Sequence, residues 1–264
     1  STFDQEISNP EALAVRLSDR HFGIGGDGII LVCPSKVADA KMKMYNLDGS
    51  EGKMCGNGIR CVGKFLYDHG MVDINEKDEI TIETLSGIKK LKAYTSGGKV
   101  NRLRVDMGKA ILDPKEIPVV LDGDKVVDRP VEIAGKNYNI TCVSMGNPHC
   151  VVFMDDIDNL DIETVGPEFE NDKLFPERVN TEFVTVLDDH TIKMRVWERG
   201  SGETWACGTG ACAVAVAACE NGFCKKGEDI KIKLKGGDLI INYTDETVYM
   251  TGNAEKVFEG EVEV

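Results

Sequence analysis

Two cysteines occupy matching positions in the chain. Cys55 and Cys207 each begin a Cys-Gly-x-Gly tetrapeptide, and 152 positions separate them. Each precedes a glycine-rich segment typical of a helix start, where free backbone N–H groups bind anions and the helix dipole favours a thiolate. One such cysteine would indicate a nucleophile or a redox centre. Two in symmetry-related domains that face one cleft indicate two-base racemisation or epimerisation, in which one sulfur removes a proton from a carbon and the other delivers one to the opposite face.

The same helix starts could also stabilise the charge that develops in this reaction. Removing the Cα proton of an amino acid pushes negative charge into its carboxylate. Preorganised backbone donors lower the energy of such a transition state. The candidate donors are the N–H groups that follow the two cysteines, namely those of Gly56, Asn57 and Gly58 and of Gly208, Thr209 and Gly210. We therefore expect a reaction without a cofactor.

The remaining cysteines carry little chemical signal. The chain has nine, an odd number, and none forms a Cys-x-x-Cys pair. A disulfide framework and a structural zinc site both require paired residues, so we expect neither, and no metal site is predicted.

The segments around the two cysteines form an internal repeat. Residues 41–46 and 193–198 alternate like half-buried strands, and each ends in an aromatic and a polar residue before a Gly-Ser turn. Gly70 and Gly222 lie fifteen residues after the respective cysteines, where each would end a helix. Two strand-like runs separated by a glycine turn then follow in both halves. The sequence thus predicts two similar α/β domains related by a pseudo-twofold axis.

The two predicted helices differ in polarity. Residues 211–219 are apolar on every side, which indicates a helix buried all round, as if a sheet wraps it. The first helix is more amphipathic, with Lys64 and Asp68 on one side, although we expect it to be mostly enclosed. Two prolines, Pro114 and Pro118, interrupt the pattern between the halves. We place the N-terminal domain at residues 1–114, with 253–264 returning to it, and the C-terminal domain at 115–252.

Composition and charge exclude several classes of partner. The chain has 264 residues, of which 42% are hydrophobic and 29% charged, as in globular proteins with a core. The net charge of −14 opposes binding to nucleic acid or to anionic membrane surfaces. The longest apolar run, residues 211–219, is far shorter than a membrane span, and no leader peptide is evident. These features predict a cytoplasmic protein.

Four motifs resemble the diaminopimelate epimerase family. They are residues 54–61 (MCGNGIRC), 145–150 (MGNPHC), 177–180 (ERVN) and 198–211 (ERGSGETWACGTGA). They occur in the family's order, and the resemblance runs from about His21 to Gly252.

The resemblance implies a fold, an activity and an assembly. The fold would be of the α+β type within the α/β class, with two pseudo-symmetric domains. Each would be an antiparallel curled sheet around a central helix, with the active site in the interdomain cleft. The substrate would be LL-diaminopimelate, a small zwitterion converted to the meso form on the route to lysine and the cell wall. The family favours a homodimer.

The resemblance also assigns roles to individual residues. Cys55 and Cys207 match the catalytic cysteines, and His149 and Glu198 match residues that set their protonation. The residues that match holders of the non-reacting end of the substrate are Asn46, Asn147, Asn180 and Arg199. Those that match donors to the reacting carboxylate are Gly56, Asn57, Gly208 and Thr209. An arginine and several amides are the groups that a distal carboxylate and ammonium require.

This sequence departs from the family's pattern in two places. The N-terminal glycine-asparagine-aspartate segment, which supplies a substrate-binding asparagine, is absent from it. Some members have a glutamine where this chain has Gly28. One side-chain contact would then be missing or supplied by another group.

Three alternatives remain at the level of sequence. A proline or hydroxyproline racemase of the same fold would usually have histidine where this chain has Asn57. A thiol redox switch would use Cys55 and Cys207 as a reversible disulfide. A binding module would hold the substrate without turnover. Exchange of solvent deuterium at the substrate Cα separates these alternatives.

Overall fold

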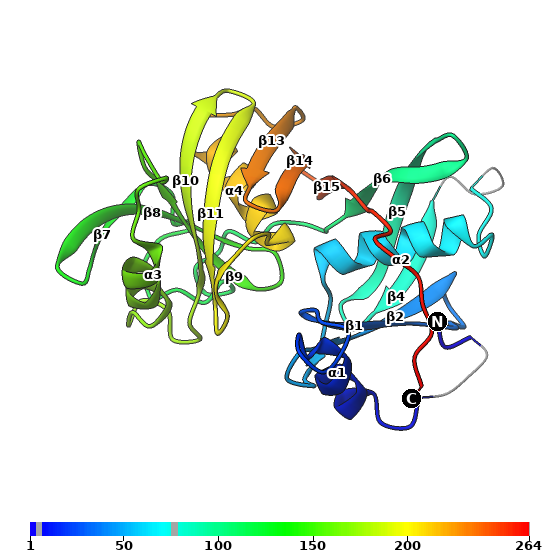
Figure 1. Cartoon of the computed structure of the whole chain (residues 1–264). Helices are drawn as coiled ribbons and strands as arrows, with labels where there is room; N and C mark the ends of the chain where they lie inside the picture. Colours follow the sequence, from blue (N-terminus) through cyan, green and yellow to red (C-terminus); the bar gives the residue numbers. More distant parts are fainter. Residues whose placement is uncertain (4–6, 75–78, 264) are drawn as a thin grey trace. The chain divides into compact units, whose positions relative to one another are not determined.

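A computed structural model describes residues 1–3, 7–74 and 79–263. Contacts divide the chain into two compact units, residues 1–105 with 252–264 (unit 1) and residues 106–251 (unit 2) (Figure 1). The change of unit falls before Pro114, the boundary that the sequence favours. Ile111 forms a β-bridge with Ser144, which ties the proline-containing segment to unit 2.

Unit 1 is a sheet with two helices. Its strands follow the order β1-β2-β4-β5-β6, with β3 paired to β2. The elements in chain order are α1 (Pro10–Ser18), β1 (Gly28–Cys33), β2 (Ala40–Asn46), β3 (Glu51–Gly52), α2 (Gly56–Asp68), β4 (Ile80–Thr84), β5 (Gly87–Ser96) and β6 (Lys99–Asp106).

The helix α2 packs on β4 and β5 through a narrow apolar stripe. Ile59, Leu66 and the strand residues Ile82 and Leu91 are fully buried. A side chain at Gly63 would place its Cβ 2.6 Å from Leu103 Cδ2, so glycine lets the helix approach the sheet. The amphipathic character of the first helix is thus explained, because only one of its faces contacts the strands.

Unit 2 extends the same plan. Its strands follow the order β15-β14-β13-β11-β10-β9-β8-β7, with β12 paired to β11. The elements are β7 (Arg129–Ile133), β8 (Lys136–Ser144), β9 (Pro148–Phe153), α3 (Ile162–Glu170), β10 (Asn180–Asp188), β11 (Thr191–Glu198), β12 (Gly202–Thr204), α4 (Gly208–Glu220), β13 (Asp229–Leu234), β14 (Gly237–Tyr243) and β15 (Val248–Asn253).

The helix α4 is enclosed as predicted. It contacts β8, β9, β10, β13 and β14, and every residue from Gly210 to Ala218 is buried. Small side chains on all sides let strands approach from several directions. A separate apolar cluster, which includes Phe169 and Phe183, lies under α3. The order of elements from β10 to β15 repeats the order from β1 to β6, which confirms the predicted mixed α/β fold in two parts.

The sheets are mostly antiparallel, but each contains parallel neighbours. β2 pairs with β4 and β11 with β13 in the parallel sense, and β9 pairs with β10 likewise. The predicted antiparallel sheets therefore need this correction. The reason is topological, because a chain that leaves β2 or β11 and passes through a helix re-enters the sheet in the same direction.

One further feature concerns the length and polarity of the helices. Among the helices of residues 1–3, 7–74 and 79–263, none combines the length and the apolar character needed to cross a bilayer.

Candidate functional site

The two cysteines cap the two equivalent helices in the same way. Cys55 is the N-cap of α2 with φ −129° and ψ 120°, and Cys207 is the N-cap of α4 with φ −124° and ψ 110°. The amide of Gly58 donates to Cys55 Sγ at 3.3 Å, and the amide of Gly210 donates to Cys207 Sγ at 3.4 Å. A sulfur that accepts the N3 amide sits at the positive end of the helix dipole, where a thiolate is favoured.

The amides between each cap and its N3 residue point out of the helix. Gly56 and Asn57 begin α2, and Gly208 and Thr209 begin α4. The first N–H groups of a helix have no intrahelical acceptor, so these four are available to an anion. The structure therefore places the four predicted carboxylate donors beside their respective thiols.

The surroundings of Cys207 disfavour a resting thiolate. Its residue is 6% exposed. Burial raises the pKa of the Cys207 thiol well above its usual range, and the carboxylates of Glu198 and Glu182 raise it further. Hydrogen bonds from Thr209 and Gly210 oppose this rise without overcoming it. These surroundings favour the protonated thiol at Cys207.

Glu198 ends β11 next to this thiol. Its Oε1 accepts a hydrogen bond of 2.5 Å from Thr204 Oγ1 on β12. The strand β12 is held against β11 by the pairing of Glu198 with Gly202. Glu198 thus lies close enough to Cys207 to raise the pKa of its thiol, and both belong to unit 2.

His149 lies fully buried on β9 between two oxygens. Its Nδ1 is 2.7 Å from Glu182 Oε1, and its Nε2 is 3.1 Å from Asn147 Oδ1. The parallel register sets His149 opposite Asn180, so Glu182, two residues further along β10, lies on the same face of the sheet as His149. Asn147 approaches from the turn before β9.

Asn180 and Arg199 fix the adjacent loop. The amide of Asn180 donates to the Pro148 carbonyl at 2.8 Å and accepts from the Arg199 backbone N–H at 3.0 Å. The Arg199 guanidinium donates to the Glu177 carbonyl at 2.8 Å. Unit 2 thus brings Asn147, His149, Asn180, Glu198, Arg199 and Cys207 to neighbouring strand ends and one helix start.

The remaining predicted residues belong to unit 1. Asn46 ends β2, and its amide donates to Ser50 Oγ at 3.0 Å in the turn before β3. The Asn57 side chain accepts from the buried Arg60 guanidinium at 3.2 Å. Arg60 also donates to the Gly56 carbonyl at 2.9 Å. These contacts hold the first turn of α2 in place.

Gly28 leaves no room for a side chain. Its φ is +147°, and an added Cβ would lie 2.2 Å from the Tyr45 carbonyl oxygen. The strand β1 pairs Gly28 with Asn46, so glycine permits a close approach of the two backbones. The contact that a glutamine would make elsewhere in the family cannot come from this position.

Glu182 is the site residue that the sequence did not reveal. It is fully buried, and its Oε2 has no hydrogen-bond partner among the described residues. The local signal is an acidic residue inside the strand-like segment 179–186, which is rich in valine and threonine. A charge in a buried strand is uncommon unless it is paired, but the partner cannot be read from sequence order.

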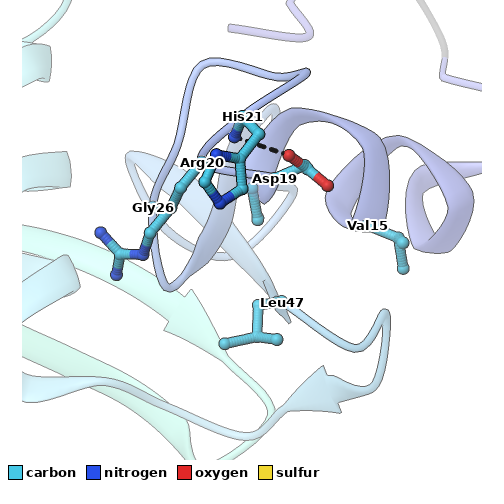
Figure 2. A pocket seen from close by; sticks show the side chains of 7 residues that line it. Val15, Asp19, Arg20, His21, Gly26 and Leu47 are labelled. Carbon is cyan, nitrogen blue, oxygen red and sulfur yellow. Dashed lines mark hydrogen bonds between the residues drawn. The ribbon is translucent and has the colours of Figure 1, made fainter.

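A surface pocket of about 410 Å³ lies elsewhere in unit 1. It contains neither cysteine. Figure 2 shows Val15 on α1, Asp19, Arg20, His21 and Gly26 on the following loop, and Leu47 on the turn after Asn46. Asp19 Oδ1 accepts from the His21 backbone N–H at 2.7 Å and shapes this loop.

Known proteins resemble the chain in sequence over nearly all its length. The family described as diaminopimelate epimerase matches residues 2–112 and 141–257. A diaminopimelate epimerase of Acetivibrio thermocellus is 53% identical over 264 residues, which cover 99% of this chain and 92% of the relative. One of Methanococcus maripaludis is 52% identical over 262 residues, which cover 98% and 93%.

Solved structures show the same architecture at lower identity. A probable proline racemase of Agrobacterium radiobacter has a TM-score of 0.69 and 18% identity, over 92% of this chain and 78% of that one. A hydroxyproline epimerase of Agrobacterium vitis has a TM-score of 0.67 and 15% identity, over 93% and 78%. These likenesses show the shared fold alone. The sequence matches, by contrast, cover both cysteine-capped helices at about half identity, and on that ground the chain belongs to the diaminopimelate epimerase family.

Proposed function

We propose that this protein interconverts LL- and meso-diaminopimelate, a step of lysine biosynthesis, with Cys55 and Cys207 as its two acid–base groups. One observation carries the mechanism, namely the identical capping of α2 and α4 by cysteines whose sulfurs accept the N3 amide. Two acid–base groups on opposite sides of one carbon can invert it, because a proton leaves one face and another arrives at the opposite face.

The proposed cycle starts with one thiolate and one thiol. The thiolate removes the Cα proton, and the electron pair moves into the substrate carboxylate. The N–H groups of Gly56, Asn57, Gly208 and Thr209 stabilise that charge. The thiol on the other side then protonates the carbon, which inverts it. The buried Cys207, whose pKa is raised, is the thiol in the direction that begins with Cys55 as the thiolate, and the reverse direction begins with the two protonation states exchanged.

The other predicted residues would select the substrate. Arg199 supplies the charge partner of the distal carboxylate, and the side-chain amides of Asn46, Asn147 and Asn180 complete the contacts with the distal amino acid group. Glu198 and His149 adjust the protonation of the thiols. We also propose, from the family resemblance, a cytoplasmic homodimer that works without a cofactor.

Isotope entry tests the two-base assignment. LL-diaminopimelate is allowed to react briefly in deuterated water. With two thiols, the newly formed meso product carries deuterium at the inverted carbon from the earliest turnovers, because the delivering sulfur carries a solvent deuteron. The remaining LL substrate stays largely undeuterated.

The opposite distribution would overturn the proposal. A single base that returns its own proton to either face would leave the original hydrogen in early product. Mass spectrometry of separated LL and meso fractions, taken below a tenth of conversion, distinguishes the two results.

A further inference from the structure

The internal repeat provides a counterpart in unit 1 for each residue from β10 to α4. The offset of 152 positions that joins Cys55 to Cys207 also preserves the strand register. Ile29 pairs with Tyr45 in unit 1, and Thr181 pairs with Trp197 in unit 2, so the same offset maps β1 onto β10 and β2 onto β11. Under it, Glu182 is the counterpart of Ile30.

Ile30 and Glu182 occupy equivalent positions in the packing of the two units. An added Cβ at Gly58 would lie 2.3 Å from Ile30 Cδ1, and one at Gly210 would lie 2.5 Å from Glu182 Oε1. Each strand side chain therefore fills the space beside the N3 glycine of its helix. Unit 1 fills that space with an apolar group. The fold of unit 2 does not require a carboxylate there, so the charge of Glu182 needs a chemical explanation.

Burying the charge of Glu182 costs free energy. Glu182 and His149 are both fully buried, at 2.7 Å from one another. An ionised carboxylate with one oxygen unpartnered is costly in such a site unless an opposite charge or a proton neutralises it. His149 can supply the opposite charge or the proton. A proton shared between Nδ1 and Oε1 gives the pair zero net charge, whether it resides on the nitrogen or on the oxygen.

The protonation of Nε2, the second ring nitrogen of His149, follows from this neutrality. In a net-neutral pair, Nε2 of His149 also carries a hydrogen, whether the ring is an imidazolium beside a carboxylate or a neutral ring beside a protonated carboxyl. Nε2 lies 3.1 Å from the Asn147 oxygen, which is an acceptor. The alternative, a bare Nε2, would leave a net negative charge in the core and two acceptors facing one another.

We propose that Glu182 is a positioning residue that keeps a hydrogen on Nε2 of His149 and holds the ring between Asn147 and β10. The proposal rests on the proposed function, in which His149 adjusts thiol protonation. A neutral Glu182–His149 pair places no net charge next to Gly210, whose amide binds the Cys207 sulfur. Cys207 can then become a thiolate during turnover beside Glu198, with the charge of Glu182 offset by His149.

Other titratable groups face the pair and must be considered in its pH behaviour. Burial raises the pKa of the Glu182 carboxyl, His149 opposes that rise, and Glu198 adds to it. Cys150 follows His149 on β9 and therefore lies on the other face of the sheet. Burial, Cys142 and Glu182 together raise the pKa of the Cys150 thiol, so Cys150 stays protonated at neutral pH.

The direct test measures the protonation of the His149 ring and does not depend on the reaction. Nitrogen-15 spectra of the four histidines are recorded from pH 6 to 9, and the His149 signals are identified by their loss in His149→Gln. In the unsubstituted protein both ring nitrogens carry hydrogen through neutral pH. In Glu182→Gln the counter-charge is lost, so His149 becomes a neutral ring with one bare nitrogen in that range. Identical ring states in the two proteins would overturn the proposal.

Activity provides the second readout. Glu182→Gln lowers kcat/KM by about 10- to 100-fold, the usual effect of removing an outer partner of a functional histidine, and narrows the pH profile on its alkaline side. Glu182→Asp keeps the charge and recovers part of the loss. Glu168→Gln removes an exposed carboxylate from α3 of the same unit and leaves kcat/KM and the profile unchanged. A merely structural role would give equal losses in the Gln and Asp variants.

The two proposals fail separately. The ring spectra need no turnover, so an unchanged ring in Glu182→Gln rejects the role of Glu182 while the isotope result stands. Retained hydrogen in early meso product rejects the two-cysteine mechanism whatever the ring spectra show. Thermal unfolding of each variant, followed by circular dichroism, verifies that the samples compared are folded.

Discussion

The helix starts at Cys55 and Cys207 share one backbone geometry but have different surroundings. Both cysteines are N-caps, and both sulfurs accept the N3 amide. Cys55 is partly exposed, and a buried arginine, Arg60, lies in the first turn of its helix. Cys207 is buried with the carboxylates of Glu182 and Glu198 nearby. The duplicated motif thus has a partly exposed sulfur in one unit and a buried sulfur with two carboxylates nearby in the other.

This difference suits a two-base reaction. A pair of thiols with equal surroundings would tend to carry the same protonation state. Burial and the carboxylates near Cys207 hold it as a thiol, which is one half of the thiol and thiolate pair that begins the proposed reaction. The repeat supplies the symmetry that inversion needs, and the side chains around it break that symmetry.

The largest expected effect comes from removing either sulfur. Cys55→Ala and Cys207→Ala each lower the epimerisation rate about a thousand-fold or more, the order of magnitude of a general acid or base, because either half-reaction fails without its partner. Coupled assays of meso-diaminopimelate formation measure the loss. Cys61→Ala and Cys219→Ala, on the same two helices, serve as matched controls with normal rates. Near-normal turnover in either of the first two variants would remove that sulfur from the mechanism.

A smaller effect is expected at Arg199. Its counterpart under the 152-residue offset is Leu47, so unit 1 has no equivalent charge at this place. Arg199→Met lowers kcat/KM about 10- to 100-fold, because a charge-assisted hydrogen bond to the distal carboxylate is lost. Arg199→Lys retains the charge and part of the rate. Steady-state kinetics over a range of diaminopimelate concentrations measure kcat and KM. Unchanged values of both in the Met variant would mean that another group binds the distal end of the substrate.

Thiol labelling sharpens the comparison directly. Iodoacetamide at pH 8 modifies Cys55 several-fold faster than Cys207, because alkylation requires an accessible thiolate. Cys207 is buried, and burial, Glu198 and Glu182 raise the pKa of its thiol. Glu198→Gln removes one negative charge, lowers the pKa of Cys207 and so speeds its modification. Peptide mass spectrometry gives both rates. Equal labelling of the two cysteines would show that the electrostatic difference has no effect in solution.

The smallest effect is on stability. Burial raises the pKa of Glu203, but hydrogen bonds from Arg195 and Lys235 outweigh it and lower the pKa below its usual value. A carboxyl with a lowered folded-state pKa stabilises the fold above its unfolded pKa, and this contribution is lost as the pH falls through the folded-state value. Glu203→Gln therefore lowers the free energy of unfolding at pH 7 by about 1–2 kcal/mol, measured in urea.

The repeat again supplies the control. Glu51 is the counterpart of Glu203 under the 152-residue offset and is exposed on β3. Glu51→Gln leaves the free energy of unfolding at pH 7 nearly unchanged. As the pH falls through the folded-state pKa of Glu203, the Glu203 variant and the unsubstituted protein converge in stability, because the carboxyl is then protonated in both the folded and the unfolded state. A Glu203 variant as stable as the unsubstituted protein at pH 7 would show that the ion pairs with Arg195 and Lys235 contribute nothing net.

Local pattern was sufficient for much of the fold and for the positions of the candidate site residues. The alternation in residues 41–46 and 193–198 predicts strands, and β2 and β11 occupy those segments. The glycines at 70 and 222 predict the helix ends, and both have positive φ just after α2 and α4. These features depend on neighbours within one turn or one strand, where periodicity and glycine conformation are decisive.

The sequence by itself determined the two cysteine-capped helices, their repeat at a constant offset, and the mixed α/β plan. Tertiary structure decided how strands pair and what surrounds each thiol. The parallel neighbours in both sheets arise from the path of the chain through a helix, and the pairing of His149 with Glu182 joins residues 33 positions apart on adjacent strands. Periodicity identifies which face a residue occupies, but it cannot identify the partner on that face. Burial and charge at the two sulfurs therefore became known only when the strands were placed side by side, since both depend on groups that are distant along the chain.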